Sequence, residues 1–292
     1  MGAGGEFLYD TVIIGSGPAG VSASLYLKRA GINVLVISKS SSALIKAESV
    51  ENYYGLPEPI TGTRLFDNGI TAAKNLGIEF LDAQVVGVSQ SGDFLISSTA
   101  GDYMAKTVLI ATGAARNTLK AAGAEEFEGR GISYCAVCDA FFFKGKKIAV
   151  IGAGEYALHE LQYLLPVAGN VSLFTNGAAP TVDFPEELTV YNERIIAFKG
   201  GDRLTHIILE DGSEKETDGA FIALGIADGS GLARKLGAVT EGADIKTDGT
   251  MMTNIPGVFA AGDCTGGILQ ISKAVYEGMA AALSIIKRFK KS

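Results

Sequence analysis

Apolar residues along the chain form short runs separated by glycine-rich turns. Residues 9–14 form one such run, rich in β-branched side chains, and it ends at the glycine-rich stretch 15–20. This pattern predicts a buried parallel strand followed by a tight turn. Residues 21–30 then predict a helix closed by Gly31, and residues 33–37 predict a second strand. The order of strand, glycine turn, helix and strand is typical of a nucleotide-binding unit.

The same order of elements returns further along the chain. Residues 147–151 predict a strand, residues 152–157 a glycine turn, residues 158–165 a helix and residues 171–174 a strand. Two copies in one chain indicate two nucleotide-binding domains. We therefore expect an α/β fold with two Rossmann-like, three-layer domains, the second inserted into the first.

The C-terminal part of the chain predicts elements that would complete the first domain. Residues 108–113 and 258–263 predict strands that end on a glycine and on an acid, and residues 270–288 predict a closing helix. The first domain is then discontinuous. The expected bounds are 1–113 with 244–292 for the first domain and 114–243 for the inserted domain.

Composition excludes several classes of protein. A chain of 292 residues with 47% hydrophobic residues has enough apolar side chains for two ordinary domains. The formal net charge of −7 argues against a nucleic acid as partner. No apolar run approaches the roughly 20 residues of a membrane span, and no basic leader precedes one, so we expect a cytoplasmic protein without a membrane partner.

The first glycine turn is a candidate nucleotide site. Gly15 permits the tight turn, Gly17 lets the backbone approach a pyrophosphate, and Gly20 allows the helix to pack on the strand. The free N–H groups at the helix start would bind phosphate. The alternative is a turn used for packing alone. The candidate binding residues here are Gly15, Ser16, Gly17, Pro18, Ala19 and Gly20.

The kind of nucleotide depends on two strand ends. The second strand ends on Ser38 and Lys39 instead of an acid that would hold a ribose; Lys39 either meets the adenosine part or is a surface lysine. Gly262 and Asp263 end a predicted strand near the C-terminus. An acid in that position can bind the polyol of a flavin, although it can also be a helix cap.

Two of the three cysteines, Cys135 and Cys138, are separated by two residues. This spacing lets two sulfurs form a small, reducible disulfide, and a position at a helix start lowers the pKa of a thiol. A zinc site would need further ligands, but the two histidines are far apart in sequence. An inert buried pair is the other alternative. A dithiol beside a nucleotide site indicates electron transfer between a cofactor and a disulfide.

Together these motifs resemble thioredoxin reductases of the small, bacterial type over nearly the whole chain. The resemblance rests on the order and spacing of Gly15–Gly20, Ala111-Thr112-Gly113, Gly129-Arg130-Gly131, Cys135–Asp139 and Ala260-Ala261-Gly262-Asp263. It implies bound FAD, a homodimer, and thioredoxin as the protein substrate. It further implies FAD contacts at the first glycine turn and at Asn52, Thr112, Gly113, Asp263, Gln270 and Ile271.

The resemblance also implies how the dithiol is used. Cys138 would face the flavin, Cys135 would attack the target disulfide, and Asp139 would move protons to and from the thiols. These three residues are the expected catalytic residues, and no metal is expected.

The second glycine turn departs from the family. After residues 171–174 no cation is present to bind the 2′-phosphate of NADPH, and no lysine or arginine occurs between Lys147 and Arg194. Glu155 stands where a pyrophosphate would meet the helix, and Tyr156 is bulky where the family has a small residue. We therefore expect a degenerate NAD(P)H-binding fold in the inserted domain.

A ferredoxin-dependent flavin branch of the family is similar in lacking nicotinamide motifs, so we expect reduced ferredoxin as the electron donor. Two alternatives remain: an NADPH-dependent thioredoxin reductase with an atypical site, and a flavoprotein redox sensor without turnover. An acidic ferredoxin would need a local basic patch. Candidate cations for it are Lys287, Arg288, Lys290 and Lys291, or Arg116, Lys120 and Arg130.

Overall fold

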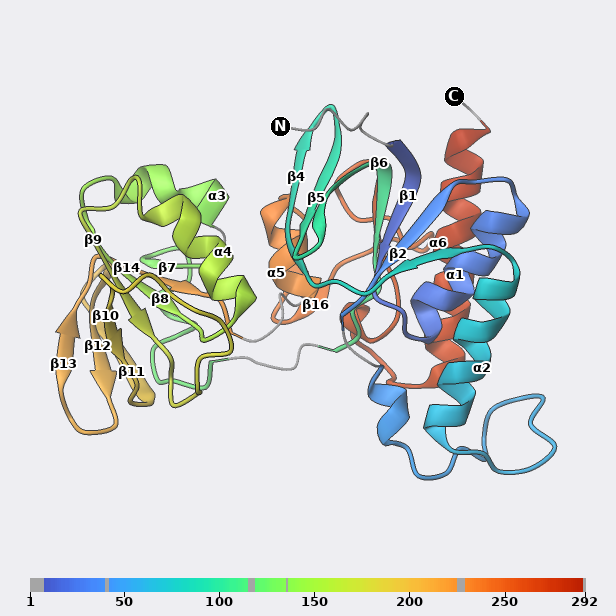
Figure 1. Ribbon diagram of the computed structural model, residues 1–292, viewed down its shortest axis with the longest axis horizontal. Helices are drawn as coiled ribbons and strands as arrows, with labels where there is room; N and C mark the ends of the chain where they lie inside the picture. The colour runs from blue at the N-terminus through green and yellow to red at the C-terminus, as the bar shows by residue number, and fades with distance from the viewer. Residues whose placement is uncertain (1–7, 40–41, 115–118, 135, 225–228, 291–292) are drawn as a thin grey trace. The chain divides into compact units, whose positions relative to one another are not determined.

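The computed structural model describes residues 8–39, 42–114, 119–134, 136–224 and 229–290, without the side chains of residues 137 and 138. The chain divides into two compact units, Met1–Ala115 with Asp228–Ser292, and Arg116–Ala227. Figure 1 shows both units in ribbon form. Each contains a parallel sheet with helices against it, so the expected α/β fold with two Rossmann-like sheets is confirmed.

The first unit is built on a seven-stranded sheet of order β3-β2-β1-β6-β5-β4, with β17 also paired to β6. Strands β1, β2, β3, β6 and β17 run parallel, whereas β4 and β5 form an antiparallel extension. The strands are β1 (Leu8–Ile14), β2 (Val34–Ile37), β3 (Glu79–Leu81), β4 (Val85–Ser91), β5 (Asp93–Ser98), β6 (Gly101–Ile110) and β17 (Val258–Ala260).

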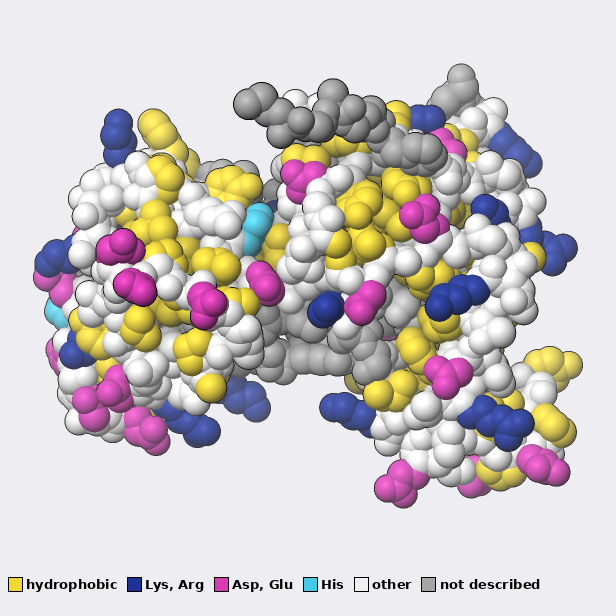
Figure 2. Space-filling model, viewed as in Figure 1, with side chains coloured by type: hydrophobic (Ala, Val, Ile, Leu, Met, Phe, Trp, Pro, Cys, Tyr) yellow, Lys and Arg dark blue, Asp and Glu magenta, His cyan; other side chains and the backbone are white. Residues whose placement is uncertain are grey.

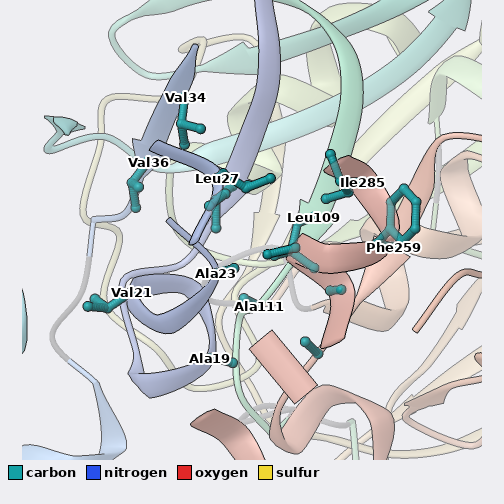
Figure 3. Close-up of a cluster of buried hydrophobic side chains, with 14 of the residues drawn as sticks. Ala19, Val21, Ala23, Leu27, Val34, Val36, Leu109, Ala111, Phe259 and Ile285 are labelled. Atoms are coloured by element: carbon teal, nitrogen blue, oxygen red, sulfur yellow. The ribbon is translucent and has the colours of Figure 1, made fainter. Parts of the chain in front are cut away.

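Helices α1 (Pro18–Arg29), α2 (Gly62–Asn75) and α6 (Ile271–Phe289) belong to the same unit. The core of the unit joins α1 and α6 to the sheet, with side chains such as Leu27, Leu109 and Ile285 fully buried (Figure 3). Helices α1 and α6 approach closely because Gly278 has no side chain: a Cβ there would lie 2.1 Å from the carbonyl oxygen of Ala19. The segment after residue 257 therefore supplies a strand to the sheet of the first unit and a helix that packs against it.

The second unit contains a five-stranded parallel sheet of order β10-β9-β8-β14-β7 and a three-stranded antiparallel sheet, β11-β12-β13. Figure 1 shows α3 (Ala136–Asp139) and α4 (Glu155–Leu164) on one side of the parallel sheet and the antiparallel sheet on the other. Between the two sheets lies a second core. The strands are β7 (Ile132–Ser133), β8 (Lys147–Ile151), β9 (Asn170–Phe174), β10 (Thr189–Tyr191), β11 (Ile195–Gly200), β12 (Leu204–Leu209), β13 (Glu214–Glu216) and β14 (Gly219–Ile222).

The smaller elements are short helical turns and one hairpin. The first unit contains the 3₁₀ turns η1 and η3, helix α5 and the β15–β16 hairpin. The second unit contains the 3₁₀ turn η2. Their bounds are η1 (Ala43–Lys46), η2 (Ala140–Phe143), α5 (Gly229–Lys235), β15 (Thr240–Glu241), β16 (Asp244–Ile245) and η3 (Asp263–Thr265).

Several boundaries differ from the sequence expectation: β6 and β17 end three residues earlier than expected, and α4 begins three residues earlier. Helix α1 begins at Pro18, inside the glycine motif and not after it, because proline is well suited to the first position of a helix. Helix α5 belongs to the first unit, although the sequence placed this segment in the inserted domain. Lys235 Nζ donates to the carbonyl oxygen of Val86 at 3.1 Å, a partner far away in sequence that no local pattern reveals.

Candidate functional site

The first glycine turn connects β1 to α1 and requires glycine at two positions. Gly15 has a φ of +112°, and a Cβ there would lie 2.3 Å from the carbonyl oxygen of Ala111. A Cβ at Gly20 would lie 2.0 Å from the carbonyl oxygen of Gly15. Gly17 is different, because the nearest atom to its Cβ position is Ser42 Oγ at 3.4 Å. The backbone at Gly17 therefore has room for a ligand.

The start of α1 suits an anion. Gly17 is the N-cap residue, no side chain caps the helix, and its first turn contains no acidic residue. The N-terminal N–H groups and the helix dipole attract a phosphate in such a place. Ser16 Oγ donates to Ser38 Oγ at 3.0 Å, which joins the turn to the end of β2. Lys39, the next residue, is exposed.

Thr112 and Gly113 follow the end of β6. Among the described residues no hydrogen-bond partner exists for Thr112 Oγ1, although this atom is buried. A buried hydroxyl without a partner costs free energy, so it points to a group that completes it. Gly113 has a φ of +78° and open space around its Cβ position.

Asp263 begins η3, three residues after the end of β17, whereas the sequence predicted that the strand itself would end on this residue. Its carboxylate is half-buried and makes no hydrogen bond to any side chain or backbone group in the described part of the chain. Burial raises the pKa of this carboxyl, opposed by Lys273 and reinforced by the charge of Glu277. A carboxylate in this setting gains from a ligand with hydroxyl donors.

Sequence reasoning missed the pair that shapes the Asp263 loop. Glu277 is buried in α6, and its Oε2 accepts hydrogen bonds from the Gly262 N–H at 2.8 Å and from Thr265 Oγ1 at 2.9 Å. Lys273 Nζ lies 3.2 Å from the same oxygen and donates to the carbonyl oxygens of Gly262 and Gly266. A lysine and a glutamate four residues apart on one helix face were the available signal.

Three other expected binding residues stand apart from these contacts. Asn52 is exposed and its side chain has no hydrogen bond to another described residue. Gln270 is the exposed N-cap residue of α6 and makes no capping bond, and Ile271 is half-buried. The chain's own contacts therefore bring together the glycine turn, Thr112, Gly113 and Asp263, but leave the role of these three residues as a prediction.

Residues 134–139, which contain the expected redox pair and are called the redox segment below, follow β7. Cys135 and the side chain of Cys138 lie outside the described residues, so the expected pair is supported by sequence alone. Asp139, the expected proton donor, is described: Ser133 Oγ donates to its Oδ2 at 2.7 Å. This hydrogen bond holds the carboxyl group of Asp139, at the end of α3, against the end of β7. The third cysteine, Cys264, is buried and donates to the carbonyl oxygens of Ile110 and Ala261.

The second glycine turn connects β8 to α4 and is covered by a neighbouring loop. Thr181 donates both its N–H and its hydroxyl to the carbonyl oxygen of Ala153, at 2.8 and 3.3 Å. A Cβ at Gly154 would meet Thr181 Oγ1 at 3.0 Å, in contrast to the open position at Gly17. Glu155, in the first turn of α4, adds a negative charge where a phosphate would bind.

One cation does lie near this loop. The aliphatic part of Arg194 lies against Gly177, whose Cβ position is 3.1 Å from Arg194 Cγ. Gly177 follows β9 by three residues, but Arg194 reaches it from the start of β11, a tertiary contact that the sequence did not reveal. The sequence Gly225-Ile226-Ala227-Asp228 lacks the proline-bearing loop usual in the family that the motifs resemble, and these residues lie outside the described residues.

Comparison with known proteins agrees with this arrangement. The family model described as pyridine nucleotide-disulphide oxidoreductase matches residues 9–278, which places the chain in that class. The chain is 36% identical to the thioredoxin reductase of Aquifex aeolicus over 301 aligned positions, covering 96% of this chain and 93% of the relative. Within the class, the chain belongs to the low-molecular-weight thioredoxin reductase family.

Solved structures extend the comparison. The atypical thioredoxin reductase TRi from Desulfovibrio vulgaris Hildenborough is 38% identical, with a TM-score of 0.90 and coverage of 97% of this chain and 99% of that one. A ferredoxin-flavin thioredoxin reductase from Clostridium acetobutylicum is 31% identical, with a TM-score of 0.77 and coverage of 98% and 99%. Within the described residues, no helix is both long enough and apolar enough to cross a membrane.

Proposed function

We propose that this protein is a flavoprotein disulfide reductase that passes electrons from FAD through Cys135 and Cys138 to thioredoxin, with reduced ferredoxin as the donor. The observation that carries the proposal is the contrast between the two glycine turns. The first is open at Gly17 and uncapped, whereas Thr181 covers the second and Glu155 adds a negative charge there. One turn is suited to a dinucleotide and the other is not.

The first unit offers groups that suit FAD. The α1 N-terminus would hold the pyrophosphate, Asp263 would accept from the hydroxyls of the polyol chain, and Thr112 would donate its unused hydroxyl. When bound, FAD accepts electrons singly and delivers them as a pair, which a nicotinamide does not do. Reduction of one disulfide takes two electrons and two protons, so two reduced ferredoxins would supply one turnover.

Asp139 would hold and deliver the protons. Its Oδ2 accepts from Ser133 Oγ, which leaves Oδ1 to accept a proton and return it to a thiol. We further propose that thioredoxin docks beside it on η2, where the rings of Phe141 and Phe142 are 79% and 67% exposed. Exposed aromatic pairs of this kind are typical of protein-binding surfaces.

The distribution of surface charge bears on where ferredoxin, the proposed electron donor, would dock. On the face shown in Figure 2, lysines and arginines lie among aspartates and glutamates over both units. Of the candidate cations, Lys287, Arg288 and Lys290 are exposed close together at the end of α6, whereas Lys120 and Arg130 are exposed ten residues apart in sequence; Arg116 and Lys291 lie outside the described residues. We therefore place ferredoxin docking at the end of α6, with a homodimer as the expected assembly.

The decisive experiment compares electron donors side by side without oxygen. Purified holoprotein is mixed with NADPH, NADH or a reduced bacterial ferredoxin, and the flavin absorbance is followed. We expect fast bleaching with ferredoxin alone, followed by reduction of thioredoxin in many turnovers. Bleaching by NADPH at a comparable rate would contradict the ferredoxin proposal, and a single reduction without turnover would indicate a redox sensor.

Variants assign the steps. Cys135→Ser should retain FAD and accept electrons but lose thioredoxin reduction, because the attacking thiol is absent. Phe142→Ser should raise the KM for thioredoxin about tenfold through the loss of one aromatic contact, whereas Tyr54→Ser, at a fully exposed ring of the first unit, should not.

The NADPH-dependent alternative is favoured by one observation, the position of Arg194 against Gly177. If this cation held a 2′-phosphate, Arg194→Ala would raise the KM for NADPH and leave the KM for NADH unchanged. Arg203→Ala, at an exposed arginine of the same unit, is the matched control. We expect neither substitution to change the rate of flavin reduction, because neither NADPH nor NADH should reduce the protein.

A further inference from the structure

Two side chains of helix α4 make hydrogen bonds to the redox segment. Tyr156 and Glu160 are four residues apart and therefore lie on the same helix face. Both are buried, with exposures of 4% and 1%. Neither has a role in the proposed electron path, and Glu160 is among the most buried charged residues of the described chain.

Tyr156 contacts the residue before Cys135. Its hydroxyl donates a hydrogen bond to the carbonyl oxygen of Tyr134 at 2.9 Å. The position at which the sequence suggested interference with a nucleotide therefore has another use in the structure. The bulky ring connects the second glycine turn to the redox segment.

Glu160 contacts the residue after Cys135. Its Oε2 accepts a hydrogen bond from the Ala136 N–H at 2.5 Å, and its Oε1 lies 3.4 Å from His159 Nδ1. A carboxylate removed from water is costly to keep unless its oxygens have partners. A buried glutamate that contacts the backbone of the redox segment therefore needs a reason beyond packing.

The two hydrogen bonds hold the carbonyl group of Tyr134 and the N–H group of Ala136, the two chain neighbours of Cys135. We propose that Tyr156 and Glu160 are positioning residues for the Cys135–Cys138 couple, and that the carboxylate of Glu160 makes the couple a stronger reductant. The inference rests on the proposed function. Backbone N–H groups near a CxxC stabilise thiolate, and a stabilised thiolate makes a couple more oxidising. Glu160 occupies one such N–H group and adds a negative charge, so it favours the disulfide form.

Redox titration of the holoprotein tests the proposal. Wild type, Glu160→Gln and Tyr156→Phe are equilibrated in dithiothreitol buffers, and the free thiols are counted by alkylation and mass spectrometry. Glutamine keeps an oxygen that accepts from the Ala136 N–H but removes the charge. Controls on the same helix are Glu155→Gln and Tyr163→Phe, since Glu155 is exposed and Tyr163 is 40% exposed.

We expect Glu160→Gln to shift the equilibrium about tenfold toward the dithiol, which is about 30 mV for a two-electron couple. Tyr156→Phe should speed hydrogen exchange at the backbone of residues 133–139 at least threefold, and both controls should match wild type. A wild-type potential in Glu160→Gln, or wild-type exchange in Tyr156→Phe, would overturn the proposal while leaving the proposed function intact. If the wild type shows no titratable disulfide, the proposed function fails and the inference fails with it.

Discussion

Replacing Thr112 by valine should affect the apoprotein and the FAD complex in opposite directions. Valine has nearly the same shape as threonine and removes only the hydroxyl. In the structure this hydroxyl is buried without a partner among the described residues, so the apoprotein gains when it is removed. In the complex the same hydroxyl would donate to FAD, so binding becomes weaker.

The size of each effect follows from the hydrogen bond involved. An unpaired buried polar group costs about 1–3 kcal/mol, so the free energy of unfolding of the apoprotein should rise by about 1 kcal/mol. In a unit of this size such a gain raises Tm by about 2–4 °C. Loss of one hydrogen bond of about 1 kcal/mol to FAD should raise its Kd roughly fivefold.

Thr107→Val is the matched control, at a threonine on β6 five residues before Thr112. Thr107 Oγ1 is hydrogen-bonded to Thr11 Oγ1 at 2.8 Å and donates to the carbonyl oxygen of Asp10 at 2.9 Å. Valine at 107 should therefore lower the stability of the apoprotein by about 1–3 kcal/mol. Urea unfolding of both apoproteins and FAD titration followed by flavin fluorescence measure the two effects. If Thr112→Val destabilises the apoprotein like the control, or binds FAD as tightly as wild type, the reasoning is refuted.

Three further predictions concern the same unit. Gly20→Val should destabilise the protein by about 2–3 kcal/mol and release FAD, because its Cβ would lie 2.0 Å from a carbonyl oxygen, whereas Gly69→Ala in α2, with 3.6 Å of room, should be neutral or stabilising; urea midpoints and flavin retention would check both. Burial raises the pKa of Cys264 to about 12, so this thiol should not react with a disulfide reagent at pH 8. The test uses a variant whose CxxC cysteines are serines, and modification of this variant in its folded state would contradict the prediction. Burial also raises the pKa of Asp263 above its unfolded value of 3.8, so the charged form costs stability as the pH rises through that interval. Asp263→Asn should therefore stabilise the apoprotein at pH 7 but not at pH 3, and equal shifts in urea midpoint at both pH values would argue against this origin.

Much of the first unit follows from local patterns. The apolar run before Gly15 is β1, and the strand predicted at 108–113 overlaps its parallel neighbour β6, which ends at Ile110. Glycine spacing indicated the turn correctly, because only glycine tolerates the positive φ at Gly15 and the close contact at Gly20. Such steric requirements are set by one residue and its nearest neighbours, so they are visible in the sequence.

Contacts between distant segments were not visible in this way. Glu277 binds the backbone of Gly262, and Thr181 covers the turn at Ala153. Arg194 meets Gly177 because β10 pairs with β9, which brings the residues after β10 beside those after β9. Arg194 is the first cation after β9 in the sequence, and the fold brings it back to the loop that follows β9.

The sequence by itself determined the class of fold and predicted the place of the chemistry. Hydrophobic periodicity selects strands and helices, and glycine and cysteine spacing marks the turns and the redox pair, because both depend on neighbours along the chain. The tertiary structure alone decided what surrounds those motifs. The Thr112 hydroxyl is buried without a partner among the described residues, Thr181 covers the second turn, and Glu160 accepts a hydrogen bond from the N–H of Ala136, next to Cys135 in the chain. Burial and hydrogen bonding depend on residues that approach through space, and a residue's neighbours in the chain do not specify them.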